Sequence, residues 1–376
     1  MGYKVSINTE KPLILYPETF NLGDFNNFLK NIKVWKKIDI YAQQLEEYYE
    51  IKHPNKIKSF DEFKKDYRTG DLAGAWVYYP WSGELIHVLD ANKLDELRTN
   101  RNQELISSGE QNILRNSKLG VAGMSVGSGI VLSCIYSGIS NDIKIADFDN
   151  LSTTNLNRLK EKLSHIGSSK AMLTARQIYE LNPFAEIDIF QDINSGNINE
   201  FFNDPKIDLV VDEIDDFKMK VQLRIKAKNF GIPLLMFTSL GDNILIDIER
   251  YDTDRNLPIF NGAIGKEAEN ILSKDKITEE DLKRYAVSIV GPNYVPTLAL
   301  KSLLNIGTSL VGRPQLYSTI AVDGGLAAYI IRQILLKKEV LSGRYFVKFA
   351  ELVNIKSDEL NETSERKDIL DKLMNR

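Results

Sequence analysis

Apolar and polar positions divide the middle of the chain into short apolar runs separated by segments with helical spacing. The apolar runs are continuous instead of alternating, as strands are when both faces of a parallel sheet are covered. They lie at residues 119–123, 143–148, 186–190, 207–212 and 233–237. Helical segments follow the first four runs, at residues 127–137, 169–181, 198–202 and 218–230. This order predicts an α/β domain with a doubly wound, mostly parallel sheet.

The pattern changes on both sides of this region. Residues 243–251 alternate, which predicts an antiparallel extension at the far side of the sheet. Before the sheet, a strand at 12–17, a helix at 61–67 and a hairpin over 73–90 predict a small α+β N-terminal module. Other expected elements are a helix with a charged face at 95–117, charged loops or helices at 266–284, helices at 295–311 and 320–336, and a strand at 344–349. We expect a module at 1–95, a main domain at 96–355 and a charged tail at 356–376.

Composition excludes several classes of protein. The chain has 376 residues, 43% of them hydrophobic, and a net charge of −4. Without a domain-wide basic excess, nucleic acid is not an expected partner, apart from a modified RNA base as a substrate. Cys134 is the single cysteine, so neither an internal disulfide nor a Cys-x-x-Cys zinc site can form. With no long apolar run, we expect a cytoplasmic protein and no membrane partner.

The first candidate site is the glycine-rich turn GMSVGSG at residues 123–129, between the first apolar run and its helix. Such a turn lets backbone amides approach phosphate at a helix N-terminus. Gly123, Ser125 and Gly127 are the expected contacts, although Ser125 stands where the strict G-x-G-x-x-G pattern has its second glycine. Strand, turn, helix and strand in this order indicate a Rossmann-like nucleotide-binding unit.

Charged residues after the strands extend this candidate site. Asp147 ends the second strand, where a carboxylate accepts hydrogen bonds from ribose hydroxyls, and Asp149 either joins it or caps the next segment. Arg158 and Lys170 follow and could clamp a polyphosphate, although each alone is more often a surface charge. Two cations there favour nucleotidyl or phosphoryl transfer over NAD-linked redox chemistry.

An acidic run, Asp212-Glu213-Ile214-Asp215-Asp216, follows the fourth strand. The carboxyl ends of the strands are where sheets of this kind bind ligands. Mg²⁺ takes one or two carboxylates together with phosphate oxygens, so the run is a candidate magnesium site. A solvated acidic turn is the alternative interpretation.

Several motifs occur in an order that resembles the ThiF/MoeB/ubiquitin-activating-enzyme superfamily of adenylating enzymes. The resemblance covers about residues 98–352. Its motifs are Arg98-Thr99-Asn100-Arg101, Asp147-Phe148-Asp149, Asn155-Leu156-Asn157-Arg158, Gly167-Ser168-Ser169-Lys170-Ala171, Leu181-Asn182-Pro183, Asp212-x-x-Asp215-Asp216-Phe217 and Gly231-Ile232-Pro233. The altered glycine turn and the stretch Trp76–Gly83 look most like an uncharacterised bacterial branch that is sometimes fused to a nitroreductase-like domain.

The resemblance implies binding of ATP and Mg²⁺ and attack of a carboxylate on the α-phosphate. By position, Asn155, Arg158 and Lys170 would contact the phosphates and Asp215 would hold magnesium. Arg101 would reach into the site of the partner subunit of a homodimer. The zinc-binding cysteines of some members are missing here. No cysteine follows Asp215, so transfer to a thioester is not expected.

We therefore expect an ATP-dependent adenylyltransferase that activates a carboxylate or a similar oxygen nucleophile without a catalytic cysteine. Its substrate could be the C-terminus of a small ubiquitin-like protein or peptide, or a small acyl compound. Two other hypotheses stay open at this point. One is a non-catalytic nucleotide-binding scaffold, which the altered glycine turn allows, and the other is an NAD- or flavin-linked redox partner.

Overall fold

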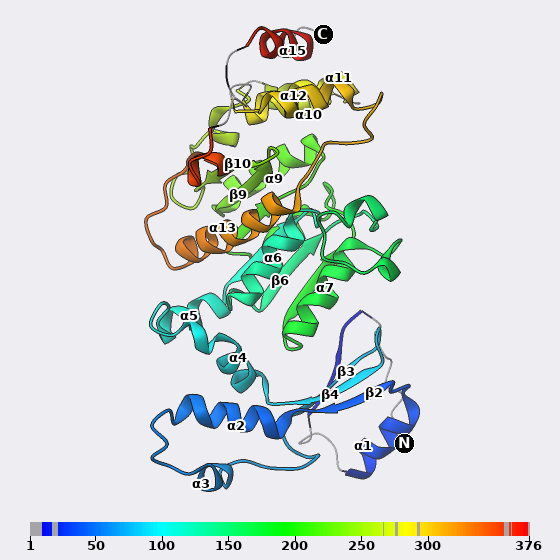
Figure 1. Ribbon diagram of the computed structural model, residues 1–376, viewed down its shortest axis with the longest axis vertical. Coiled ribbons are helices and arrows are strands. Elements are labelled where there is room, and N and C mark those ends of the chain that lie inside the picture. Colours follow the sequence, from blue (N-terminus) through cyan, green and yellow to red (C-terminus); the bar gives the residue numbers. More distant parts are fainter. Residues whose placement is uncertain are drawn as a thin grey trace. The chain divides into compact units, whose positions relative to one another are not determined.

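The chain folds into two compact units. The computed structural model describes residues 10–16, 22–265, 267–274, 277–291, 294–356, 361 and 363–374. The smaller unit comprises Met1–Asn112 with Ile135–Gly138 and Ala175–Ala185. The larger unit comprises Ile113–Cys134, Ile139–Thr174 and Glu186–Arg376. Each unit has its own sheet (Figure 1).

The smaller unit is built on a four-stranded sheet with the order β1-β3-β4-β2. Its strands are β1 (Leu13–Leu15), β2 (Lys36–Asp39), β3 (Ala75–Tyr79) and β4 (Glu84–Val88). β3 and β4 form the expected antiparallel hairpin, and β2 pairs with β4 in parallel. The helices are α1 (Leu22–Asn31), α2 (Tyr41–Lys52) and α3 (Phe60–Lys64). Ser59 caps α3 with a capping box, as its sequence predicts.

The centre of the smaller unit is an aromatic stack around His87. The imidazole of His87 lies parallel to the rings of Trp76 and Tyr41, with centroids 4.2 Å and 4.8 Å away. Its two ring nitrogens lie 3.0 Å from Asp39 Oδ1 and 2.7 Å from the carbonyl oxygen of Ala73. Trp76, Tyr78 and Tyr79 of the hairpin are buried and belong to the core of this unit.

The helix expected over residues 95–117 is interrupted, and that prediction was wrong in detail. The chain forms α4 (Ala91–Thr99), a 3₁₀ turn η2 (Asn100–Asn102) and α5 (Ser108–Arg115). Glu104 adopts a φ of +68°, which an α-helix does not accommodate. Ser107 then restarts the helix, because its hydroxyl accepts the Glu110 N–H while the Glu110 carboxylate accepts the Ser107 N–H.

The larger unit has the predicted Rossmann-like sheet, with the order β11-β10-β9-β8-β5-β6-β7. Its strands are β5 (Lys118–Ala122), β6 (Asp142–Ala146), β7 (Glu186–Phe190), β8 (Leu209–Asp212), β9 (Leu234–Ser239), β10 (Asn243–Glu249) and β11 (Gly343–Lys348). The pairs among β5 to β9 are parallel. β10 is antiparallel to β9, as expected, but β11 and not β10 forms the far edge.

Helices cover both faces of this sheet. They are α6 (Gly127–Tyr136), α7 (Lys170–Leu181), α8 (Ile198–Asn203), α9 (Phe217–Phe230) and α13 (Tyr317–Leu335). Gly120 packs against Phe201 of α8, whereas the next residue, Val121, packs against Gly127 of α6. Because consecutive strand residues point to opposite faces, α6 and α8 lie on opposite sides of the sheet.

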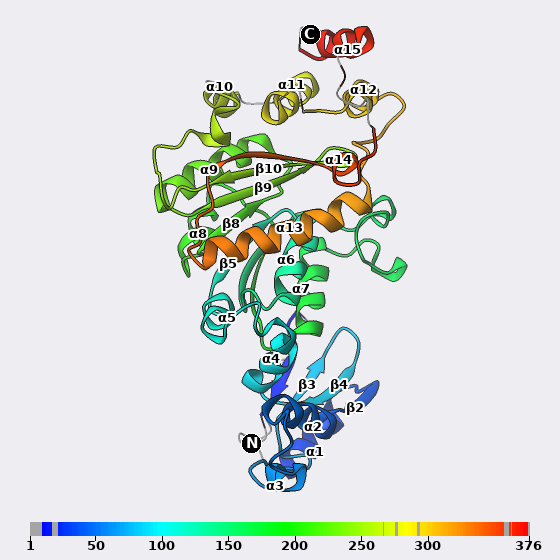
Figure 2. The ribbon, with the colours of Figure 1, turned by 60° about the vertical axis from the view of Figure 1, so that its left-hand side comes forward.

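Helix α13 packs closely on α6 and runs across the sheet (Figure 2). A β-carbon at Gly324 would lie 2.9 Å from the carbonyl oxygen of Gly129 and 2.6 Å from Ser133 Oγ. A small residue is therefore required at this crossing, as the pair Gly324-Gly325 predicts. The same helix also contacts β9 and β10, which places the side chains on one of its faces beside the carboxyl end of β9.

The remaining helices are α10 (Glu267–Ser273), α11 (Glu279–Val290), α12 (Thr297–Asn305), α14 (Phe349–Leu352) and α15 (Ser364–Met374). The helix expected over 295–311 is thus shorter. Ile369 and Leu373 of α15 are buried in one hydrophobic cluster with Leu300 and Leu303 of α12. None of the helices in the described part of the chain combines the length and the apolar character that crossing a membrane requires.

Candidate functional site

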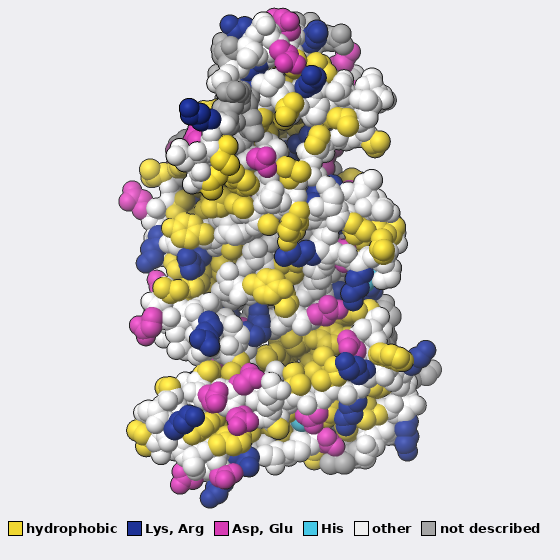
Figure 3. Space-filling model, viewed as in Figure 1, with side chains coloured by type: hydrophobic (Ala, Val, Ile, Leu, Met, Phe, Trp, Pro, Cys, Tyr) yellow, Lys and Arg dark blue, Asp and Glu magenta, His cyan; other side chains and the backbone are white. Residues whose placement is uncertain are grey.

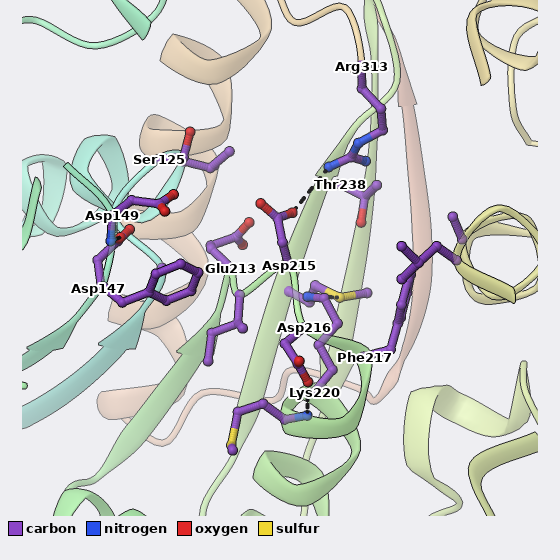
Figure 4. Close-up of a pocket in the computed structure, with 18 of the residues that line it drawn as sticks. Ser125, Asp147, Asp149, Glu213, Asp215, Asp216, Phe217, Lys220, Thr238 and Arg313 are labelled. Carbon is purple, nitrogen blue, oxygen red and sulfur yellow. Dashed lines mark hydrogen bonds and ion pairs between the residues drawn. The ribbon is translucent and has the colours of Figure 1, made fainter. Parts of the chain in front are cut away.

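A pocket of about 960 Å³ opens at the carboxyl ends of the parallel strands of the larger unit. Its lining comes from the segments that follow β5, β6, β7 and β8, from the end of β9, from helices α9, α11 and α12, and from the segment before α13. Of the residues predicted from sequence, it includes Gly123, Ser125, Asp147, Asp149, Asn155, Arg158, Lys170 and Asp215. Figure 4 shows side chains from several of these segments around one cavity. Gly127, the first residue of α6, is not part of the lining.

The glycine turn depends on its first glycine. Gly123 has a φ of +93°, and a β-carbon there would lie 2.2 Å from the carbonyl oxygen of Glu213. Glycine is therefore required both by the backbone conformation and by the close approach of the loop after β8. Ser125 lines the pocket where α6 begins, and the first amide groups of a helix have no partner within the helix. This arrangement is suited to an anion.

Asp147 organises the turn in addition to facing the pocket. Its Oδ2 accepts the Met124 N–H at 2.6 Å, and its Oδ1 accepts the Asp149 N–H at 2.7 Å. Burial raises the pKa of the Asp147 carboxyl, and these two backbone hydrogen bonds and Lys170 oppose the rise. A ribose hydroxyl would use the remaining lone pairs of the same carboxylate.

A short antiparallel contact brings Asp149 and Lys170 together. Asn150 and Ser169 form a β-bridge, and the Lys170 N–H donates to the carbonyl oxygen of Asp149 at 3.0 Å. Lys170, the first residue of α7, extends its ammonium to Asp149 Oδ2 at 2.7 Å. Only 8% of the Lys170 side chain is exposed, so the cation is held in a low-dielectric position beside the pocket.

The segment between them contains a 3₁₀ turn, η3 (Thr153–Asn155), which ends at Asn155, and Arg158 follows in the next turn. Asn155 Oδ1 accepts the Ser152 N–H at 2.9 Å, which closes this turn. Arg158 Nη1 donates to the carbonyl oxygen of Thr154 at 3.1 Å and to Asn157 Oδ1 at 3.0 Å. Partial burial lowers the pKa of Arg158, as does the nearby Arg313, although the guanidinium stays charged.

Asp215 lies in the loop after β8 and lines the same pocket as these cations. Its side chain is 89% exposed and its Oδ1 lies 3.6 Å from Arg313 Nη2. Figure 4 shows the Arg313 guanidinium above the Asp215 carboxylate. Within the described residues no group of three or more His, Cys, Asp and Glu side chains gathers as a metal cage would require. One carboxylate together with phosphate oxygens and water is nevertheless a sufficient donor set for Mg²⁺.

Arg101 is not part of this pocket. It lies in η2 of the smaller unit and is exposed. The pocket lining does not include it. Its role in the site of a partner subunit stays a prediction.

Several lining residues were not singled out from the sequence: Thr238, Ser239, Arg313 and Gln315. Glu213 also lines the pocket, and the sequence had placed it in the acidic run that directly follows a strand. Arg313 is far from the motifs in sequence, but the carbonyl oxygen of Gln315 accepts the Asn157 Nδ2–H at 2.9 Å. This hydrogen bond ties the segment before α13 to the turn that carries Arg158, and no local pattern reveals it.

A network of buried ion pairs anchors Asp212, the first residue of the acidic run. Arg224 Nη1 lies 2.5 Å from Asp212 Oδ2, and its Nε lies 2.8 Å from Glu249 Oε2. All three side chains are fully buried. Burial alone would raise the pKa of Asp212, but Lys220 and Arg224 more than offset it and the pKa is lowered. Asp212 is therefore a structural anion and not a free metal ligand.

A family model decides the classification. The model of the ThiF family matches residues 97–367. The chain belongs to the ThiF family. The matched range contains the whole pocket and Arg101, so the family resemblance and the geometry concern the same residues.

Two curated relatives show how far the ThiF-family likeness extends. The chain is 33% identical over 276 residues to an uncharacterised protein, MT1398, of Mycobacterium tuberculosis, and the match covers 72% of this chain and 37% of that protein. It is 31% identical over 143 residues to tRNA threonylcarbamoyladenosine dehydratase of Bacillus subtilis, covering 38% of this chain and 55% of the enzyme. The chain thus spans less than two thirds of the length of either relative.

Solved structures of similar proteins include the Escherichia coli tRNA N6-threonylcarbamoyladenosine dehydratase TcdA. It is 18% identical, has a TM-score of 0.46, and matches over 64% of this chain and 95% of that one. The structure of E. coli MccB with ATP is 16% identical with a TM-score of 0.40, over 61% of this chain and 58% of that one.

Proposed function

We propose that this ThiF-family chain is an ATP-dependent adenylyltransferase. A carboxylate of the substrate would attack the α-phosphate of ATP, giving an acyl-adenylate and pyrophosphate. The observation that carries the proposal is the convergence of Arg158, Lys170 and Asp215 on one pocket that begins at the glycine turn. Adenylation needs positive charge around a phosphate in the transition state, and the two cations supply it in a partly buried place.

Mg²⁺ fits the donor set of this pocket. The exposed carboxylate of Asp215 would hold the ion, which would complete its coordination with phosphate oxygens and water. When bound, the ion would neutralise charge on the departing pyrophosphate. Asp147 would receive the ribose, and Ser125 and Gly123 would allow the phosphates to approach the N-terminus of α6.

The acyl substrate would react without passing through a thioester. Cys134 lies within α6 with 0% exposure, and burial raises the pKa of its thiol to about 12. A buried thiol of this kind is not a nucleophile. The substrate would therefore be a carboxylate that is consumed at the adenylate stage, such as a peptide C-terminus, a small acid or the carboxylate of a modified RNA base. The similarity to tRNA threonylcarbamoyladenosine dehydratase supports the last class.

A homodimer would complete the site with Arg101 of the second copy. The exposed apolar side chains of α13, among them Tyr317, Val322 and Tyr329, support an association through the larger unit. Figure 3 shows hydrophobic side chains gathered over this part of the unit. Such exposed apolar surface is typical of an interface between subunits.

ATP–pyrophosphate exchange tests the proposal. The purified chain would be incubated with ATP, Mg²⁺ and labelled pyrophosphate, with three substrates in separate arms: tRNA bearing threonylcarbamoyladenosine, a peptide ending in Gly-Gly, and acetate. We expect exchange in one arm and its loss in Lys170→Ala. ATP binding without exchange in any arm would favour a scaffold, and calorimetric preference for NAD or FMN over ATP would favour a redox role.

A further inference from the structure

Ser239 and Asp323 form a hydrogen-bonded pair at the edge of the pocket. Ser239 is the last residue of β9 and lines the pocket. Its hydroxyl donates to Asp323 Oδ2 at 2.7 Å. Asp323 belongs to α13, which packs on β9, and its side chain is fully buried. The serine hydroxyl therefore connects a buried carboxyl group to the space where the substrate would lie.

The second carboxylate oxygen of Asp323 differs from the first in its hydrogen bonding. Asp323 Oδ1 is buried and has no hydrogen-bond partner among the residues that the structure describes. An unpaired carboxylate oxygen inside a protein is costly, and most buried polar atoms are paired. A proton on the carboxyl group removes the buried charge, which is the larger part of this cost. In agreement, burial raises the pKa of Asp323 to about 7, and the hydrogen bond from Ser239 only partly opposes the rise.

Among the residues that the structure describes, no cation contributes to the pKa shift of Asp323. The ionisable side chain that faces it is Glu213, from the loop after β8, and the Asp323 charge contributes to the raised pKa of that carboxyl. From α6, Gly129 and Ser133 pack against the neighbouring Gly324. Thr319, one turn earlier on α13, donates to the carbonyl oxygen of Gly241 and not to Asp323. A carboxyl group in these surroundings changes protonation readily near neutral pH.

We propose that Ser239 and Asp323 form a proton relay for the second half-reaction, in which a nucleophile displaces AMP from the acyl-adenylate. This inference rests on the proposed adenylation and adds the step that follows it. Ser239 is the catalytic residue that touches the nucleophile, and Asp323 acts through it as the proton acceptor.

An N–H or O–H nucleophile attacks the carbonyl carbon of the acyl-adenylate, so that a C–N or C–O bond forms. The bond between that carbon and the phosphate oxygen breaks, and AMP leaves with the bonding pair. The proton of the nucleophile passes to Ser239 Oγ while the Ser239 hydroxyl proton passes to Asp323 Oδ2. Asp323 later returns the proton to solvent by the reverse path. The substrate class implied is a carboxylate joined to an uncharged amide, amine or hydroxyl.

A synthetic acyl-adenylate separates the two half-reactions without the natural substrate. Acetyl-adenylate with pyrophosphate would report the first half as ATP formed. Acetyl-adenylate with O-methylhydroxylamine, which stays unprotonated over about pH 6 to 9, would report the second half as AMP released. The variants would be Ser239→Ala, Ser239→Thr and Asp323→Asn. Thr319→Val is the matched control, because it removes a buried hydrogen bond from the same helix without touching the pair.

We expect AMP release to fall about 100-fold relative to ATP formation in Ser239→Ala and Asp323→Asn. Ser239→Thr should recover part of the rate, and Thr319→Val should match the wild type. In the wild type, AMP release should rise as the pH increases through about 7, because Asp323 accepts a proton only when ionised. Asp323→Asn should lose this inflection.

Three results would overturn the relay. They are an unchanged ratio of the two half-reactions in Ser239→Ala, a pH profile that Asp323→Asn leaves unaltered, and an acetyl group found on Ser239 by mass spectrometry, which would make the serine a covalent nucleophile. A wild-type chain that forms no ATP from acetyl-adenylate and releases no extra AMP would instead overturn the proposed adenylation. Ser239→Ala remains informative if Asp323→Asn fails to fold.

Discussion

The Lys170 ammonium is paired with the Asp149 carboxylate at 2.7 Å, at the first residue of α7. In this arrangement the acid holds the lysine in the pocket before any nucleotide binds. We predict that Lys170→Ala lowers ATP–pyrophosphate exchange by about 100-fold, because a cation beside the reacting phosphate is lost. Asp149→Asn should cost less, about 10-fold, since the lysine remains. Lys162→Ala, an exposed lysine in the same loop that does not line the pocket, serves as the control.

In the proposed site, Arg313 would compete with a metal ion for Asp215. Its guanidinium lies 3.6 Å from the Asp215 carboxylate. Removing this cation in Arg313→Ala should lower the Mg²⁺ concentration for half-maximal exchange several-fold, whereas Asp215→Asn should raise it at least about 10-fold. A magnesium titration of exchange in both variants measures this. Equal magnesium dependence in Asp215→Asn and the wild type would remove Asp215 from the metal site.

The proposed role of Arg101 in the partner's site can be tested by complementation between two inactive variants. If Arg101 acts in the partner's site, Arg101→Ala and Lys170→Ala should complement each other when mixed and refolded together. In an equal mixture about half the dimers are mixed, each with one intact site, so activity should recover to about a quarter of the wild type. No recovery in a mixture that contains mixed dimers by mass spectrometry would place Arg101 outside the partner's site.

The Asp212–Arg224–Glu249 network should dominate the stability of the larger unit. Arg224→Ala leaves Glu249 fully buried without its cation and Asp212 with Lys220 alone, and the expected loss is about 3–5 kcal/mol in the free energy of unfolding. Lys301→Ala breaks the exposed pair with Glu365 and should cost less than about 1 kcal/mol. Urea denaturation of both variants measures the difference. Similar losses in the two would show that the network contributes no more than a surface pair.

Asp323 should make the protein less stable as the pH rises. Its folded pKa of about 7 lies above the ordinary value of 3.8, so the folded state binds more protons than the unfolded state between these values. The contribution of Asp323 to the free energy of unfolding is therefore most favourable below about pH 4. It decreases as the pH rises to about 7 and then stays constant. Asp323→Asn removes the effect, and its stability relative to the wild type should increase by up to about 4 kcal/mol from pH 4 to pH 8. Thermal unfolding across this range tests the sign.

Sequence patterns predicted the sheet of the larger unit well, because its strands are continuous apolar runs and its turns carry glycine or acids. β5, β6 and β7 lie within a residue or two of their expected bounds. The helix expected over residues 95–117 failed at Glu104, where the chain adopts a positive φ that helical spacing does not reveal. Likewise, periodicity alone did not show that β11 adds beyond β10, since edge position depends on pairing between segments distant in sequence.

The candidate site likewise contains residues that local sequence patterns identified and residues that they missed. Asp147, Asp149 and Lys170 follow predicted strands or open predicted helices, so local position places them at one edge of the sheet. Ser239 and Asp323 were not found, because they are 84 residues apart and meet only where α13 crosses β9. Arg313 was not found from the sequence for the same reason. Local patterns identify residues at strand ends, but they do not identify partners that a later helix supplies.

Gly123 also bears on how other chains of this kind can be recognised. Position 123 requires glycine, because of its positive φ and its close approach to the Glu213 carbonyl oxygen. Position 125, by contrast, accepts serine. A search pattern that demands the second glycine would pass over sequences of this type. A pattern built on the first glycine, the strand-end aspartate and the lysine that opens the following helix would retain them.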